Sequence, residues 1–376
     1  MNKTKKFIAY SLILFLWIFL LEAISFTTLY VIQNKYNSLY FDYSKINIKP
    51  DLSNQNYSKK LGWISPQKNL DEFGARIDDG SYKSSCIDMF GDSFTFSLDV
   101  SDNEAWPKKL GVLLNCRVYN YGVSAYGSDQ ATMRHGFMKP SSKVAVLNHL
   151  SENIIRNVNQ SRNFIYPSGE LRLKPRYDLD NSNKLNYIPI PNIELENLNS
   201  IEYLNKNLLN DYFIPEGLSG IRMIENFSLP YSFELFRMVS NHWHVKSKIG
   251  QYPRHMPFYD FNHPSNGLKI TVEIFKKFIN QANYNNQYPI ITIIPTCLDL
   301  EYINKKKRLP YQPLIDELLK NDIIFFDFSR TFLNTDNFYD FFGNCNGHPN
   351  ASGYELMAKS FKDFINNDIY LLNNKN

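Results

Sequence analysis

The sequence predicts an α/β protein, a three-layer α/β/α domain around a central parallel sheet, preceded by one N-terminal transmembrane helix. Short apolar runs with strand character alternate with segments of helical periodicity, which is typical of βαβ units and a parallel sheet. Hydrophobic residues make up 43% of the 376 residues, enough for a sizeable core. A long apolar stretch near the N-terminus supplies the membrane helix.

The apolar stretch covers residues 7–32 and is interrupted mainly by Glu22. A helix of about 26 residues is long enough to cross a bilayer with some tilt. Lysines precede it, which predicts a cytoplasmic N-terminus and an external remainder. A cleaved signal peptide is the competing interpretation, but the stretch is long for a signal and no small-x-small site follows it cleanly. We therefore expect residues 1–32 to be an uncleaved signal anchor.

The remaining elements are expected in a regular order after a linker and lead-in over residues 33–82. Predicted strands cover residues 87–90, 118–121, 143–147, 287–295 and 323–327, and predicted helices cover residues 105–114, 130–138, 268–283, 311–320 and 351–367. This rhythm defines a domain over residues 83–376. It is lost at about 157–265, where Asn, Tyr, Leu and Pro dominate. That insertion is expected to be a lid, a substrate platform, a separate binding domain or plain surface elaboration.

Charge and cysteine content restrict the function and the compartment. The formal net charge is only +4 with no long basic run, so nucleic-acid binding has no electrostatic support. Four cysteines on an external domain permit disulfides. Cys86 and Cys116 each precede one of two neighbouring strands, which makes a Cys86–Cys116 bridge reasonable. Cys297 and Cys345 could form a second pair at the opposite edge of the sheet, and four free thiols are the alternative.

Candidate catalytic residues follow the ends of the predicted strands. Ser93 lies in a strand-to-turn-to-helix junction, where α/β enzymes place reactive groups. A serine nucleophile needs a nearby base, which His348 could supply. It also needs donors for an oxyanion, which the backbone N–H groups of Ser93 and Ala125 and the side-chain amide of Asn153 could supply. We expect no metal ion and no organic cofactor.

Four short blocks, in order along the chain, resemble the SGNH subgroup of GDSL-type esterases and lipases. They are Gly-Asp-Ser-Phe at residues 91–94, the stretch 120–130, Ser-Glu-Asn-Ile at 151–154 and Gly-His-Pro-Asn-Ala-Ser-Gly at 347–353. The resemblance implies a flavodoxin-like α/β/α fold. It also implies Ser93 as nucleophile, His348 as general base and then acid, and Ser93, Ala125 and Asn153 as the oxyanion hole.

The chain departs from the family pattern at three positions. Ala125 replaces the usual Gly, and Ile154 replaces the usual Asp after Asn153. The family acid lies three residues before the histidine, where this chain has Cys345. Losing that acid would remove the group that orients the histidine. Asp340 is the nearest replacement in the sequence. The alternatives are a Ser–His dyad, a histidine oriented by a backbone carbonyl, and a carboxylate from elsewhere.

These observations predict a membrane-anchored serine esterase or O-acyltransferase with its catalytic domain outside the cytoplasmic membrane. The expected substrates are acyl esters of saccharides, lipids or small molecules, with an O-acylated envelope saccharide preferred. The alternative function is a non-catalytic SGNH-like domain that binds glycan or assists envelope polysaccharide assembly.

Overall fold

The computed structural model describes most of the chain as two compact units. The described residues are 3–35, 57–64, 70–139, 141–166, 172–192, 203, 206–213, 228–241 and 243–369. One unit, called the helical unit below, contains residues 1–50, 161–172 and 192–250. The other, called the α/β unit, contains residues 51–160, 173–191 and 251–376.

The α/β unit is built on a five-stranded parallel sheet with the strand order β4-β3-β5-β8-β9. Its strands are β3 (Ser85–Phe90), β4 (Arg117–Asn120), β5 (Val144–Leu150), β8 (Tyr288–Ile294) and β9 (Phe325–Asp327). Numbered along the chain this order is 2-1-3-4-5, the order of flavodoxin-like folds. The topological switch point therefore lies between β3 and β5, and the crevice beyond their carboxyl ends is where such folds bind ligands.

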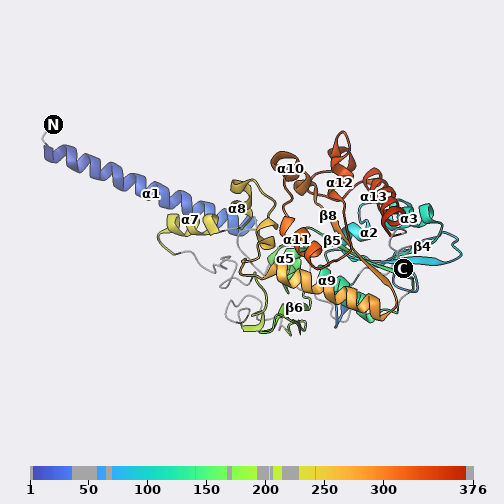
Figure 1. Ribbon diagram of the computed structural model, residues 1–376. Helices are drawn as coiled ribbons and strands as arrows, with labels where there is room; N and C mark the ends of the chain where they lie inside the picture. The colour runs from blue at the N-terminus through green and yellow to red at the C-terminus, as the bar shows by residue number, and fades with distance from the viewer. Residues whose placement is uncertain are drawn as a thin grey trace. The chain divides into compact units, whose positions relative to one another are not determined.

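Helices cover both faces of this sheet (Figure 1). Helix α3 (Trp106–Leu114) packs with α13 (Ala351–Phe364). Helix α9 (Gly267–Tyr284) packs with α4 (Ser128–Phe137), α5 (Asn153–Asn157) and α11 (Gln312–Lys320). The sequence prediction of a three-layer α/β/α domain with a central parallel sheet is confirmed.

Short elements complete the α/β unit. Two antiparallel pairs lie outside the main sheet, β1 (Tyr57–Ser58) with β2 (Gly62–Trp63) and β6 (Arg176–Leu179) with β7 (Leu185–Ile188). The remaining helical segments are α2 (Ser93–Phe96), η3 (Asp102–Glu104), η6 (Met256–Tyr259), α10 (Cys297–Lys306), α12 (Ser329–Leu333), η7 (Phe338–Phe341) and the π-helical η8 (Ile365–Ile369).

The sequence explains why these elements form. Strands β5 and β8 are nearly continuous apolar runs that are buried over most of their length, as expected for parallel strands covered on both faces. Helix α9 repeats apolar residues at helical spacing, and Leu268, Phe275, Phe278 and Ala282 are all buried. Asn350 caps α13 by accepting a hydrogen bond from the Gly353 N–H. Local pattern, capping and burial agree, which is why the strand and helix positions were predictable.

The helical unit contains α1 (Lys3–Lys35), η4 (Arg162–Phe164), α7 (Tyr231–Asn241) and α8 (Trp243–Gly250). Its α1 helix is long and apolar enough to cross a membrane over Lys3–Val31. Most of the α1 side chains are exposed, unlike those of a core helix of a globular protein. The β6–β7 hairpin falls inside the predicted insertion of residues 157–265, yet it belongs to the α/β unit.

Candidate active site

Ser93 lies where the sequence prediction placed it, at the carboxyl end of β3. It is the first residue of α2, and the side chain of the N-cap residue Asp92 accepts a hydrogen bond from the Phe94 N–H. The turn requires glycine on both sides because the chain is crowded there. A Cβ on Gly91 would lie 2.9 Å from the Asn148 carbonyl oxygen, and one on Gly122 would lie 2.9 Å from the Asp92 carbonyl oxygen. Ser93 is thus held tightly and is only 6% exposed.

His348 contacts Ser93 directly. Its Nε2 atom lies 2.8 Å from Ser93 Oγ, although the two residues are 255 positions apart. The loop that carries the histidine is fixed just before α13, because Phe342 and Pro349 form a β-bridge and the Asn350 N–H donates to the Phe341 carbonyl. The histidine ring also packs on Phe94, with ring centroids 4.8 Å apart. The structure therefore brings together the two residues that the sequence paired.

The carboxylate beside His348 is Asp99. Its Oδ2 atom lies 2.6 Å from His348 Nδ1, on the side of the ring that faces away from Ser93. The assignment of Asp340 to this position is corrected by the geometry. The Asp340 carboxylate accepts from the Asn337 side-chain amide, and its backbone carbonyl accepts from Asn350, so it serves the η7 turn instead.

Arg76 anchors the loop that presents Asp99. Its side chain is buried, and it donates to the carbonyls of Phe96 at 2.5 Å, Ser97 at 2.6 Å and Val100 at 2.7 Å. Its Nε also pairs with Asp102 at 2.6 Å. Contacts on both sides of residue 99 restrict the loop, so a side chain that is 60% exposed can still hold one position beside the histidine. No pattern in the sequence indicates that Arg76 anchors this loop.

Asn153 has the environment expected of an oxyanion donor. It begins α5, directly after the loop that follows β5. The residue is 0% exposed, yet neither its Nδ2 nor its Oδ1 atom has a hydrogen-bond partner among the described residues. Buried polar groups are rarely left unpaired. Asn153 follows β5, which is the neighbour of β3, the strand that leads to Ser93. A buried amide that has no hydrogen-bond partner at this place is suited to bind a ligand.

Ala125 adopts the backbone conformation that glycine would favour. Its φ is +69°, in the left-handed region. The loop around it is held by the lead-in segment, since the Trp63 side chain donates to the Ser124 carbonyl and the Tyr126 hydroxyl donates to the Trp63 carbonyl. The departure from glycine that the sequence showed is therefore accommodated by packing, and the Ala125 backbone N–H is retained.

Arg156 connects three of the four sequence blocks. Its guanidinium lies 3.0 Å from Asp92 Oδ2 and 3.2 Å from Glu152 Oε1, and it donates to the Tyr126 carbonyl at 3.1 Å. Burial raises the pKa of Asp92, and the charge of Arg156 opposes this shift. The arginine was missed in the sequence because its partners are set by the tertiary fold.

A buried polar network supports the loop that leads to Asn153. The Tyr259 hydroxyl donates to the Ser151 carbonyl at 2.6 Å, and its oxygen lies 2.9 Å from His149 Nε2. The Ser151 hydroxyl donates to Asp299, which pairs with His255 at 2.9 Å. Burial lowers the pKa of His149 to about 3. His149 is thus a buried, hydrogen-bonded core histidine.

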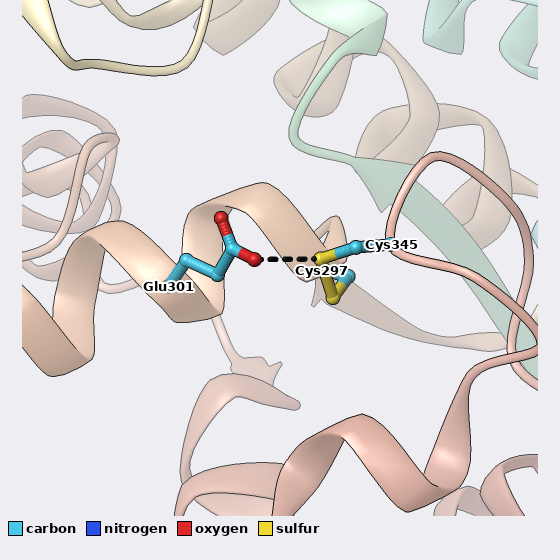
Figure 2. A group of neighbouring side chains, drawn as sticks. All are labelled: Cys297, Glu301 and Cys345. Carbon is cyan, nitrogen blue, oxygen red and sulfur yellow. Dashed lines mark hydrogen bonds between the residues drawn. A yellow bond between two sulfur atoms is a disulfide. The ribbon is translucent and has the colours of Figure 1, made fainter.

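Both disulfides suggested by the sequence are present, Cys86–Cys116 and Cys297–Cys345. The second one ties α10 to the loop that precedes His348. Figure 2 shows Glu301 beside this bridge, with its Oε1 atom 3.3 Å from Cys345 Sγ. These are the only described side chains that cluster as metal ligands would. While the cysteines are bonded to each other they offer no thiolate, so the cluster does not fit a metal ion.

No family model and no curated protein matches the sequence. Among solved structures, the chain is similar to a mutant of the esterase AlinE4 at 12% identity, covering 77% of this chain and 98% of that chain with a TM-score of 0.29. It is also similar to an acetyl xylan esterase (Est2A) from the rumen bacterium Butyrivibrio proteoclasticus at 9% identity, covering 79% and 66% with a TM-score of 0.30. Likeness this weak carries no argument about activity.

Proposed function

We propose that this protein is a serine esterase or acyltransferase of the SGNH type that uses Ser93, His348 and Asp99. The observation that carries the proposal is the continuous hydrogen-bonded chain from Ser93 Oγ to His348 Nε2 and from His348 Nδ1 to Asp99 Oδ2. This arrangement lets the imidazole accept the serine proton while the carboxylate fixes its tautomer and stabilises the imidazolium.

The reaction would proceed by acyl transfer. Ser93 Oγ attacks the ester carbonyl carbon as His348 takes its proton, and the Ser93 and Ala125 N–H groups and the Asn153 amide stabilise the oxyanion. His348 then protonates the departing alkoxide, which leaves an acyl group on Ser93. Water or an acceptor hydroxyl attacks this acyl-enzyme, with His348 again accepting the proton. These steps need no metal ion and no organic cofactor.

Membrane anchoring belongs to the same proposal. Helix α1 begins with the basic flank of three lysines and is long and apolar enough to cross a membrane, which favours a cytoplasmic N-terminus with the α/β unit outside. Two disulfides in the α/β unit fit an oxidising compartment. In that location, an aromatic-rich chain favours O-acylated envelope saccharides among the acyl esters, with no role for nucleic acid.

The alternative, a non-catalytic SGNH-like domain that binds glycan or assists envelope polysaccharide assembly, drew its support from the missing acid at residue 345 and from the altered blocks at Ala125 and Ile154. The first of these two grounds is the one that Asp99 concerns. Asp99 supplies a carboxylate at the histidine, which removes that ground.

Hydrolysis of an aryl acetate by the full chain tests the proposal. Ser93→Ala should lower kcat by at least about 10³-fold, since it removes the nucleophile. Ser182→Ala is the matched control, because Ser182 lies in the exposed turn between β6 and β7. Activity that survives in the Ser93→Ala protein would refute the assignment of the nucleophile.

A further inference from the structure

Glu22 is the one carboxylate within the apolar stretch of α1, and it is engaged by another helix of the helical unit. Its Oε2 atom accepts from the Tyr231 N–H at 2.5 Å, and its Oε1 atom accepts from the Ser232 N–H at 3.3 Å. The Ser232 hydroxyl donates to the same carboxylate. An acidic side chain in a membrane helix is costly unless it is paired, and here it is paired with the first residues of α7.

This contact supplies hydrogen-bond partners both to the Glu22 carboxylate and to the N-terminus of α7. The first backbone N–H groups of a helix have no acceptor within the helix, and in a bilayer no water replaces one. The partial positive charge at the α7 N-terminus also favours a carboxylate. Glu22 therefore caps α7 at a depth where few other acceptors exist.

Packing continues along one face of α1. Glu22, Ser25 and Leu29 follow one another at helical spacing and are recessed, with Ser25 2% and Leu29 0% exposed. The ring of Phe26 lies 5.0 Å from that of Tyr231, between centroids. Figure 1 shows α7 beside the C-terminal half of α1.

The position along α1 sets the depth of α7. About 20 residues of helix cross the hydrocarbon core of a bilayer. Counted from the last lysine of the basic flank, this length ends at Phe26. The stretch from Glu22 to Leu29 thus spans the boundary between the outer hydrocarbon and the headgroups. A helix held against that stretch lies at the same boundary.

Helix α7 presents an apolar face that has no cover within the described residues. Phe233 and Phe236 recur at helical spacing on α7 and are 59% and 70% exposed. Leu229, two residues before the helix begins, is 70% exposed. Exposed Ile24 on α1 extends apolar surface at the same level, being 55% exposed. In water such a set of side chains would be unfavourable, whereas amphipathic helices at membrane interfaces bury faces of this kind among acyl chains.

We propose that α7 is an interfacial membrane helix, docked to α1 through Glu22, with Leu229, Phe233 and Phe236 inserted among the acyl chains of the outer leaflet. The proposal rests on the proposed membrane anchoring by α1 and not on ester hydrolysis. It assigns Glu22 a structural role in the membrane and makes part of the chain's insertion a second membrane contact.

Single-cysteine labelling of the full chain in phosphatidylcholine vesicles tests the proposal. All four native cysteines form disulfides, so one introduced cysteine carries the only free thiol. An environment-sensitive fluorophore is attached in turn to Phe19→Cys on α1, Phe236→Cys on α7 and Tyr284→Cys, an 89% exposed position on α9. Quenching by spin-labelled lipid reports contact with acyl chains, and quenching by iodide reports contact with water.

We expect lipid quenching at positions 19 and 236, and iodide quenching at position 284. Lipid quenching at 19 but not at 236 would overturn the α7 proposal while leaving the anchor intact. Absence of lipid quenching at both positions would overturn the anchor and the α7 proposal together. A label at 236 shielded from both quenchers would place this face against protein, which also overturns the proposal. Ester hydrolysis measured on the same vesicles is independent of each outcome.

Glu22→Leu tests the docking contact. The substitution makes α1 more apolar, so lipid quenching at position 19 should persist. Without its cap, α7 should detach, and lipid quenching at position 236 should be lost. Retention of full quenching at 236 in this variant would show that Glu22 does not hold the helix.

Discussion

The residues on the two sides of Ser93 differ in burial and in how they are held in place. On one side, Asp92, Asn153 and Arg156 are buried, and an ion pair in the interior holds the serine turn to α5. On the other side, Asp99 is 60% exposed and is positioned by the anchored ends of its loop. The buried side therefore couples the site to the stability of the fold. The exposed side can be changed with little effect on folding, so chemistry and stability should separate between the two sides.

The largest expected effect is on the exposed side. Asp99→Asn should lower kcat by about 10⁴-fold, because the asparagine cannot fix the imidazole tautomer or stabilise its cation. The unfolding midpoint in urea should not shift, since the side chain is mostly in solvent. Asp340→Asn is the matched control and should retain activity. The comparison fails if Asp340→Asn lowers kcat and Asp99→Asn does not.

The next effect is on the buried side. Arg156→Ala should lower the free energy of unfolding by about 3–5 kcal/mol, because it leaves Asp92 buried without its partner. Lys320→Ala removes a cation whose side chain is 69% exposed and paired with Glu317, and it should change that free energy by less than about 1 kcal/mol. Urea denaturation of both variants measures the contrast. Equal effects would show that burial does not distinguish the two ion pairs.

A smaller effect concerns the network behind Asn153 and depends on pH. His149 has its pKa lowered to about 3 by burial, so below about pH 6.5 the unfolded chain binds a proton that the folded protein does not. Its contribution to stability is fully present above that pH and is lost as the pH falls toward 3. We expect a loss of about 1 kcal/mol between pH 6.5 and 5.5. Urea denaturation across this range, with His149→Gln as the control, should show a shallower slope for the variant. Identical slopes would contradict a buried neutral histidine.

The smallest effect is at Ala125. The left-handed conformation of residue 125 costs an L-residue about 1–2 kcal/mol, and glycine avoids this cost. Glycine also makes the unfolded chain more flexible, which offsets about 0.4–1 kcal/mol of that gain. Ala125→Gly should therefore stabilise the protein by roughly 1 kcal/mol or less. Ala131→Gly, inside α4, should instead destabilise it by about 1 kcal/mol. Thermal unfolding distinguishes the two signs, and destabilisation by Ala125→Gly would show that its methyl group is needed for packing.

The fold was predictable because its signals are local. Strands such as β8 are apolar runs, and helices such as α9 and α13 carry their periodicity and caps in the sequence itself. Short elements were missed, among them α5, whose five residues are too few for a periodic pattern. Helix α10 was also missed, although it has ten residues and Thr296 and Asp299 form a capping box at its start.

The residues of the candidate site also fall into two groups, those with a local sequence signal and those placed by tertiary contacts. Ser93, His348 and Asn153 stand in recognisable local blocks, so the sequence singled them out as candidates. Asp99 lies 249 positions from the histidine, and its place is set by Arg76 and the loop ends, which no spacing rule encodes. One signal was present, since Asp99 follows Ser93 closely in the loop beyond β3, where parallel sheets gather reactive groups.

The most direct test of the account is covalent labelling of Ser93. The full chain is treated with a fluorophosphonate, which reacts with activated serines, and the modified peptide is located by mass spectrometry. We expect one adduct, on Ser93, that forms quickly in the native protein, slowly in Asp99→Asn and not at all after urea denaturation. An adduct on another serine, or none on Ser93 in the native protein, would contradict the assignment of Ser93, His348 and Asp99 as a catalytic triad.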